Sequence, residues 1–164
     1  MFELTTERLL LRQWKNSDGQ EIIDFYADPV MSKYVGGPRN EDDAWRGMAL
    51  MVGHWQLKGF GYWAVEEKTS GDFVGCIGLW QSPGWPELEL GYWLVERHQG
   101  KGFAKEAAEV CVCCAKEQLN AKSLVSYIDA DNSPSIKLAE SLGAKYEKVI
   151  KLADHGPHAV YRHF

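Results

Sequence analysis

The chain has no long apolar run. Of its 164 residues, 45% are hydrophobic and 25% are charged, a balance typical of a globular domain. No uncharged stretch approaches the ~20 residues of a membrane-spanning helix. The first residues, Met1 to Leu4, contain neither the basic region nor the apolar core of a signal peptide. We therefore expect one domain over residues 1–164, in the cytoplasm, with no membrane partner, as a monomer or homodimer.

The chain also lacks an excess of basic residues. It has 18 Lys and Arg against 23 Asp and Glu, so its net charge is −5. A protein that binds nucleic acid usually carries a basic excess, so we expect no nucleic-acid partner. An acidic surface suits a cationic or amine substrate, although the same charge is ordinary among cytosolic proteins.

Cysteine is scarce, and three of the four cysteines are clustered at Cys111, Cys113 and Cys114. A structural zinc site needs two pairs of ligands, and Cys76 is the only cysteine left. Helical spacing puts Cys111 and Cys114 on one face. We therefore expect buried, reduced helix residues and no bound metal.

Two common phosphate-binding motifs are missing. A Walker loop requires Gly-x-x-x-x-Gly-Lys-Ser/Thr, and a dinucleotide fingerprint requires a third glycine where Lys105 stands. The chain does contain a basic turn with two glycines, Gly100 and Gly102. The turn follows an aromatic and aliphatic strand at 88–95 and precedes a helix that begins near Ala104.

This turn is suited to an anion. The first N–H groups of a helix lack partners and lie at the positive end of its dipole. Glycine leaves those groups uncovered, and Arg97, Lys101 and Lys105 add positive charge. We expect a phosphate or a pyrophosphate to bind here. The alternative is that the turn only connects a strand to a helix.

Apolar periodicity and turn residues predict the order β-α-α-β-β-β-α-β-α-β-β. The predicted strands are 8–14, 62–65, 73–79, 88–95, 123–128, 146–152 and 159–164. The predicted helices are 17–28, 40–58, 104–115 and 133–143.

The turn resembles a known family signature. Arg97-x-x-Gly100-x-Gly102 is similar to the Gln/Arg-x-x-Gly-x-Gly/Ala motif of the GNAT superfamily of N-acetyltransferases. The run from Glu89 to Leu94 resembles the branch containing the ribosomal-protein N-terminal acetyltransferases, and Asn132-x-x-Ser135 resembles the second family motif. The resemblance covers nearly the whole chain. It implies an α/β fold (α+β mixed sheet): a central, mostly antiparallel seven-stranded sheet with a parallel splayed pair, flanked by about four helices.

The same resemblance implies acetyl-CoA as the co-substrate. Backbone groups of Leu94, Val95 and Arg97 would pair with the pantetheine arm, and Asn132 would contact the arm from the other side. The N–H groups that would bind the pyrophosphate are those of Gln99, Gly100, Lys101, Gly102, Phe103 and Ala104.

Direct transfer to a primary amine requires a base that removes the ammonium proton. Glu87 and Glu89 share a strand face with Trp93, where burial can raise a carboxyl pKa. The alternative is that one or both are solvated. Many family members carry a tyrosine acid where this chain has Ala139. In the ribosomal-protein branch a serine has a related role, which indicates Ser135, although helix-start hydrogen bonding is its other possible role.

The acceptor is predicted only by class. An aromatic cleft with an acidic rim favours an amine, although the tryptophans also suit core packing. A protein N-terminal α-amine is the first candidate; a polyamine or an aminoglycoside, or a catalytically idle acyl-CoA-binding module, is the alternative. The cleft candidates are Trp14, Tyr34, Trp45, Trp55, Trp80 and Trp85, with Glu41, Asp42 and Asp43 at the rim and His155 and His158 within reach.

Overall fold

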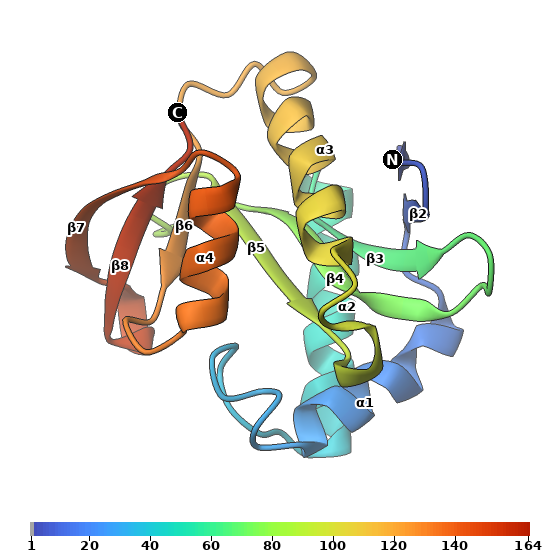
Figure 1. The fold of residues 1–164 in the computed structure, drawn as a ribbon. Coiled ribbons are helices and arrows are strands. Elements are labelled where there is room, and N and C mark those ends of the chain that lie inside the picture. Colours follow the sequence, from blue (N-terminus) through green and yellow to red (C-terminus); the bar gives the residue numbers. More distant parts are fainter. Residues whose placement is uncertain (1) are drawn as a thin grey trace.

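A computed structural model describes residues 2–164 as an open twisted sheet of eight strands with helices on both faces (Figure 1). The strands are β1 (Leu4–Thr5), β2 (Leu9–Arg12), β3 (Tyr62–Glu67), β4 (Phe73–Trp80), β5 (Glu89–Leu94), β6 (Val125–Ile128), β7 (Lys145–Lys151) and β8 (Pro157–Arg162). The α-helices are α1 (Gly19–Ala27), α2 (Glu41–Lys58), α3 (Phe103–Glu117) and α4 (Ser133–Ser141). Three short 3-10 turns are η1 (Asn16–Asp18), η2 (Glu96–His98) and η3 (Ala153–His155).

The strand order is β1-β2-β3-β4-β5-β6-β8-β7, and among the neighbouring strands within residues 2–164 only β5 and β6 run parallel. The mixed sheet and the four helices confirm the predicted fold class. The predicted count of seven strands is one too low, because Leu4–Thr5 pairs with Leu10 and Leu11 as an additional edge strand. Two residues are too short to show the alternation by which a strand is read from sequence.

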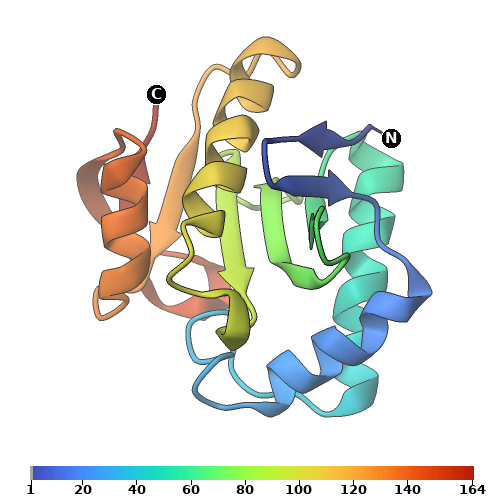
Figure 2. The ribbon, with the colours of Figure 1, turned by 45° about the vertical axis from the view of Figure 1, so that its right-hand side comes forward.

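The helices lie on opposite faces of the sheet. Helix α3 packs against β2, β4 and β5, and α4 packs against β6 and β8. Helices α1 and α2 pack on each other behind the sheet, as Figures 1 and 2 show together. Cys111 and Cys114 are buried on α3 as their spacing predicts, whereas Cys113 is exposed.

Helix α2 illustrates how the local sequence sets the boundaries of an element. The side chain of Asn40 accepts the N–H of Asp43 at 2.9 Å, which caps the helix start. The helix ends at Gly59, whose φ of 77° lies in the left-handed region that favours glycine. No helix within residues 2–164 is both long enough and apolar enough to cross a membrane.

The parallel pair β5–β6 opens almost as soon as it forms. Its one register pair is Glu89 with Val125, where the Val125 N–H donates to the Leu88 carbonyl at 3.0 Å. Beyond this point the two strands diverge toward the N-terminus of α3 (Figure 1). The opening positions the candidate site.

Candidate active site

Side chains take over the hydrogen bonds that the diverging strands give up. In a continuous parallel pair the Tyr127 N–H would donate to the Leu90 carbonyl. Here the Leu90 carbonyl accepts the hydroxyl of Ser126 at 2.8 Å. The Tyr127 N–H donates instead to the Glu89 carboxylate. The divergence of β5 from β6 therefore leaves a backbone donor for a buried acid.

Glu89 is the titratable group at the head of this opening. The residue is 9% exposed, and its Oε2 accepts the indole N–H of Trp85 at 2.8 Å. Burial raises its pKa from 4.5 to about 7, against the opposing effect of the hydrogen bonds from Trp85 and Tyr127. The carboxyl group can therefore exchange a proton near neutral pH.

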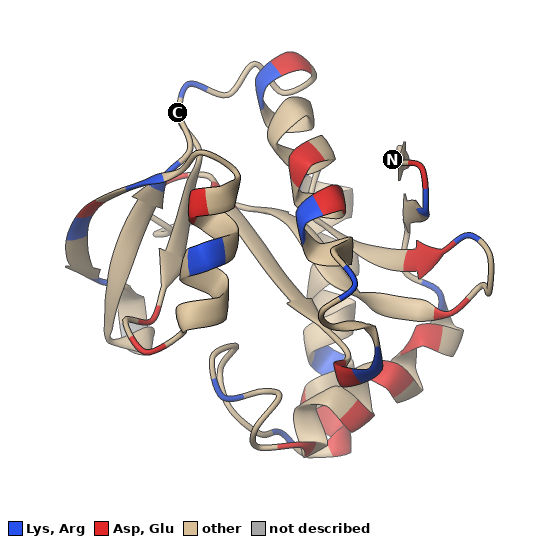
Figure 3. Cartoon of the chain, viewed as in Figure 1, with Lys and Arg blue, Asp and Glu red and all other residues tan. Residues whose placement is uncertain are grey.

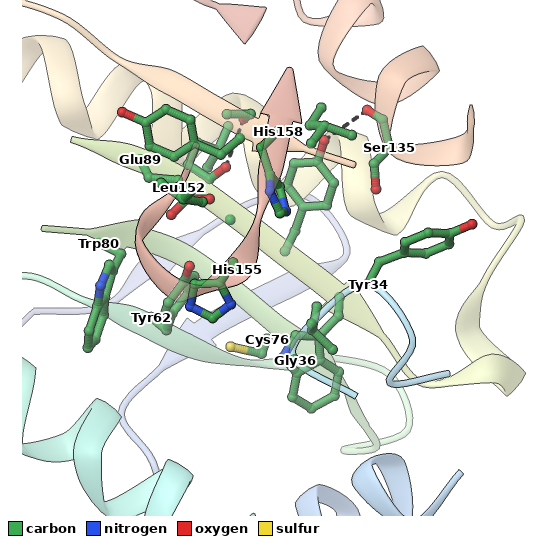
Figure 4. A pocket seen from close by; sticks show the side chains of 18 of the residues that line it. Tyr34, Gly36, Tyr62, Cys76, Trp80, Glu89, Ser135, Leu152, His155 and His158 are labelled. Carbon is green, nitrogen blue, oxygen red and sulfur yellow. Dashed lines mark hydrogen bonds between the residues drawn. The ribbon is translucent and has the colours of Figure 1, made fainter. Parts of the chain in front are cut away.

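Glu89 faces a cavity of about 360 Å³. Figure 4 shows side chains from several separate segments of the chain around this hollow, including Tyr62, Cys76, Ser135 and His155. We call this the acceptor-side cavity. The predicted cleft residues that line it are Tyr34, Trp80, Trp85, His155 and His158.

The other predicted cleft residues lie elsewhere. Trp55 is 1% exposed and belongs to the core, while the indole of Trp14 donates to the Tyr62 carbonyl and Trp45 is exposed. The acidic residues at 41–43 occupy the first turn of α2 and do not line the cavity. Figure 3 shows that acidic residues gather on α1 and on this turn.

A second cavity, of about 540 Å³, lies on the side of the glycine turn. We call it the donor-side cavity. Of the predicted cofactor residues it is lined by Leu94, Gln99, Gly100, Gly102, Phe103, Ala104 and Asn132. The two cavities share Tyr34, Val35, Tyr92, Trp93, Asn132 and Ser135. They therefore meet at the opening between β5 and β6.

The glycine turn exposes a run of backbone donors. Gly100 and Gly102 have φ values of 72° and 81°, which glycine adopts without strain. Within residues 2–164 no carbonyl accepts the N–H of Gly100, Lys101 or Gly102, and the next three N–H groups begin α3 without intrahelical partners. The N–H of Gln99 is already bonded to the Glu96 carbonyl at 3.0 Å. The available donors therefore run from Gly100 to Lys105, a fit for a pyrophosphate.

Three predicted cofactor residues do not line the donor-side cavity. The N–H of Val95 donates to the Val74 carbonyl of β4 at 3.0 Å, because alternation along the strand directs it away from the opening. The Arg97 guanidinium donates to Glu21 at 2.7 and 3.1 Å, so it is directed toward α1. The Lys101 side chain is exposed and lies near His98.

Arg8 approaches the turn where Arg97 was expected. Its guanidinium donates to the Lys101 carbonyl at 3.1 Å and to the Glu106 carboxylate of α3 at 2.7 Å. Its own N–H also donates to Glu106 at 2.9 Å. The residue just before β2 thus holds the glycine turn against α3. These contacts span about ninety residues of sequence, so local patterns could not reveal them.

The geometry separates the two glutamates. Glu87 accepts hydrogen bonds from the two terminal nitrogens of the Arg162 guanidinium at 2.9 Å and from the Ser123 hydroxyl at 2.8 Å. These donors, Arg162 first, lower its pKa to about 2. Glu87 does not line either cavity. A carboxylate so stabilised is a poor base, which leaves Glu89 as the candidate.

Ser135 lies where the two cavities meet. Its N–H donates to the side chain of Asn132 at 3.3 Å, so Asn132 caps α4. The hydroxyl of Tyr92 donates to the Ser135 carbonyl at 2.9 Å, and burial raises the pKa of Tyr92. Sequence alternation put Tyr92 on the face opposite Glu89; its link across the opening to α4 depends on the tertiary fold.

Comparison with known proteins agrees with this geometry. A family model described as an acetyltransferase (GNAT) domain matches residues 8–145. The chain belongs to the GNAT acetyltransferase family. It is therefore an acyltransferase, and acetyl-CoA is the co-substrate of that family. The run of free donors from Gly100 to Lys105 fits the pyrophosphate of this GNAT co-substrate. No group of three His, Cys, Asp or Glu in the described part of the chain could hold a metal ion.

The GNAT relatives cover almost the whole chain. A crystal structure of the acetyltransferase from Agrobacterium tumefaciens is 35% identical, covers 100% of this chain and 95% of its own, and has a TM-score of 0.91. The uncharacterized N-acetyltransferase p20 of Bacillus licheniformis is 30% identical over 92% of this chain and 86% of its own length. The ribosomal-protein-S5-alanine acetyltransferase from Vibrio fischeri is 16% identical, covers 99% of this chain and 96% of its own, and has a TM-score of 0.74. That last likeness shows a shared fold alone.

Proposed function

We propose that this protein transfers an acetyl group from acetyl-CoA directly to a primary amine, with Glu89 as the general base. The observation that carries the proposal is the meeting of two cavities at Ser135. One cavity contains the glycine turn, and the other contains the buried carboxyl of Glu89. A donor and an acceptor that enter from opposite sides would therefore react at the junction.

The proposed donor site uses backbone groups. The N–H groups from Gly100 to Lys105 bind the pyrophosphate. Alternation along β5 directs the backbone groups of Tyr92 and Leu94 into the opening, where they can pair with the pantetheine arm. Asn132 lies across the opening on the same cavity. The co-substrate supplies an acetyl thioester, which is the group that the amine attacks.

The proposed chemistry begins with the ammonium proton. Glu89 accepts this proton, because a base with a pKa of about 7 is half ionised at neutral pH. The nitrogen lone pair then forms the new N–C bond while the C–S bond breaks, and the second proton that the nitrogen gives up passes to the departing sulfur. The leaving thiolate has a pKa near ~8.5, so a hydrogen bond from the Ser135 hydroxyl is enough to stabilise it.

The acceptor class follows from the cavity that contains Glu89. A volume of about 360 Å³ lies at the small end of ligand sites, so it fits a small amine or the first residue of a peptide. The resemblance to the ribosomal-protein branch makes a protein N-terminal α-amine the first candidate to test, and a polyamine or an aminoglycoside the second.

The test is release of free thiol from acetyl-CoA in the presence of peptides, polyamines and aminoglycosides. The proposal expects turnover with at least one amine class and acetylation of its nitrogen. Coenzyme A binding without turnover on any of these amines would instead favour an acyl-CoA-binding module. Turnover that survives unchanged in Glu89→Gln would remove Glu89 from the mechanism.

A further inference from the structure

Arg39 differs from every other arginine of the chain. Five arginines pair with a carboxylate: Arg8, Arg12, Arg46, Arg97 and Arg162. Arg39 has no carboxylate within the 4.0 Å that defines such a pair among the side chains that the structure describes. It nevertheless lines the acceptor-side cavity together with Glu89. A guanidinium that faces a cavity without a partner has five donors to offer a ligand.

The structure holds this guanidinium in place from three sides. Its carbon lies 4.2 Å from the ring centre of Tyr26, and the Arg39 N–H donates to the Tyr26 carbonyl at 3.0 Å. A Cβ atom on Gly36 or on Gly47 would lie 2.9 Å from one of the two terminal nitrogens. Both glycines therefore leave room for the head group. Figure 4 shows Gly36 beside the cavity, on the segment that also carries Tyr34.

The carboxylates that share this cavity have other partners. Asp129 accepts the N–H of Asp131 at 2.8 Å, and Glu89 accepts the indole of Trp85 at 2.8 Å. Aromatic side chains, among them Tyr26 and Trp80, form part of the wall, and Arg39 is half-buried. Its charge is therefore screened less than at a fully exposed site. A planar guanidinium can bind a planar carboxylate through two parallel hydrogen bonds, so a carboxylate is the anion that fits it best.

We propose that Arg39 binds an anionic group of the acceptor, so that the substrate is a primary amine that also carries a carboxylate. This inference rests on the proposed function, since it places the amine at Glu89 and the carboxylate at Arg39 in one cavity. A free amino acid and a peptide with an acidic N-terminal residue share this chemistry. An amine that carries no anionic group would leave the Arg39 guanidinium without a partner.

The experiment compares matched acceptors. One arm uses ω-amino acids against alkylamines of the same chain length, and the other uses peptides that begin with Asp against peptides that begin with Asn. Thiol release gives kcat/KM, and calorimetry measures acceptor binding to the protein loaded with coenzyme A, where no transfer occurs. The variants are Arg39→Gln, Gly47→Ala, which displaces the guanidinium and keeps the arginine, and the control Arg46→Gln on the exposed face of α2.

In at least one arm we expect the wild type to prefer the carboxylate-bearing acceptor by about 10- to 100-fold, the range for hydrogen bonds to a charged group. In Arg39→Gln the ratio of affinities for the two acceptors falls to about one, and in Gly47→Ala it is reduced. In the control Arg46→Gln the ratio stays at the wild-type value. Equal binding of both acceptors by the wild type in both arms would overturn the inference, as would a preference that survives Arg39→Gln. A calorimetric preference without thiol release would support this anion site and count against the proposed transfer.

Discussion

Replacement of Glu89 by glutamine should raise stability at alkaline pH while it lowers activity. In the unfolded chain the carboxyl pKa is near its ordinary 4.5, and in the folded protein burial raises it to about 7. The folded state therefore binds this proton more tightly. The resulting stabilisation is complete below pH 4.5 and is lost as the pH rises through 7. The difference between the two pKa values corresponds to about 3 kcal/mol.

The assay is urea unfolding of the wild type and Glu89→Gln at pH 5 and pH 8. Glutamine matches the shape of the protonated acid and does not ionise. The variant should therefore gain on the order of 2.5 kcal/mol relative to the wild type between the two pH values. Comparison of the two proteins cancels every other titrating group. Glu96→Gln, which changes an exposed glutamate just after β5, is the matched control and should gain nothing.

Activity should change in the opposite direction. A general base contributes roughly 100- to 10,000-fold to the rate, so Glu89→Gln should lower kcat/KM at pH 8 by at least about 100-fold. The wild-type kcat/KM should rise with pH and level off above about 7, and the variant should lose this rise. Parallel stability changes in the two proteins from pH 5 to pH 8 would refute the raised pKa, and an unchanged pH–rate profile would refute the role as base.

Three further predictions concern the turn and the edge of the opening. Gly100→Asp should weaken coenzyme A binding at least about 100-fold, because it adds a negative charge to the anion site. Gly100→Asn, which has a similar shape and no charge, should weaken binding less. Calorimetry measures both affinities, and equal losses would contradict the anion site. Arg8→Ala should weaken coenzyme A binding about fivefold, a loss of about 1 kcal/mol, because it removes the contacts of Arg8 with Glu106 and the turn. An unchanged dissociation constant would show that the turn keeps its conformation without Arg8. Arg162→Met should cost about 1–2 kcal/mol of unfolding free energy at pH 7. Because Glu87 has a pKa lowered to about 2, that cost should shrink as the pH falls from 4.5 toward 2, and a cost that stays constant in urea titrations over that range would contradict the pairing.

The features that could be predicted from sequence are those with local causes. Gly100 and Gly102 form a turn directly between a strand and a helix, and both have positive φ values. The spacing of the two glycines and the patterns of the neighbouring strand and helix were therefore enough to predict this turn. The period of two along β5 put Glu89 and Trp93 on one face. Burial by aromatic neighbours then indicated the direction in which the Glu89 pKa is shifted.

The features that could not be predicted arise from contacts between distant segments. Arg97 was expected at the phosphate turn, but Glu21 of α1 lies close enough to bind its guanidinium. The spacing of Glu87 from Glu89 is that of any two residues on one face of a strand, so it does not reveal an ion pair. Glu87 pairs with Arg162 because β8 brings that arginine next to it in the fold. Arg39 lies in an irregular loop whose sequence has no periodicity, so its place in the cavity depends on the packing of α1 and α2.

We propose that acetyl transfer occurs where the two cavities meet, with Glu89 as the base. The most direct measurement is mass spectrometry of the amine product from acetyl-CoA at pH 8, made in parallel for the wild type and Glu89→Gln at equal, saturating co-substrate. We expect N-acetylated product from the wild type, at a rate at least about 100-fold above that of the variant, with equal coenzyme A affinity for both. Equal rates of product formation by the two proteins would contradict it.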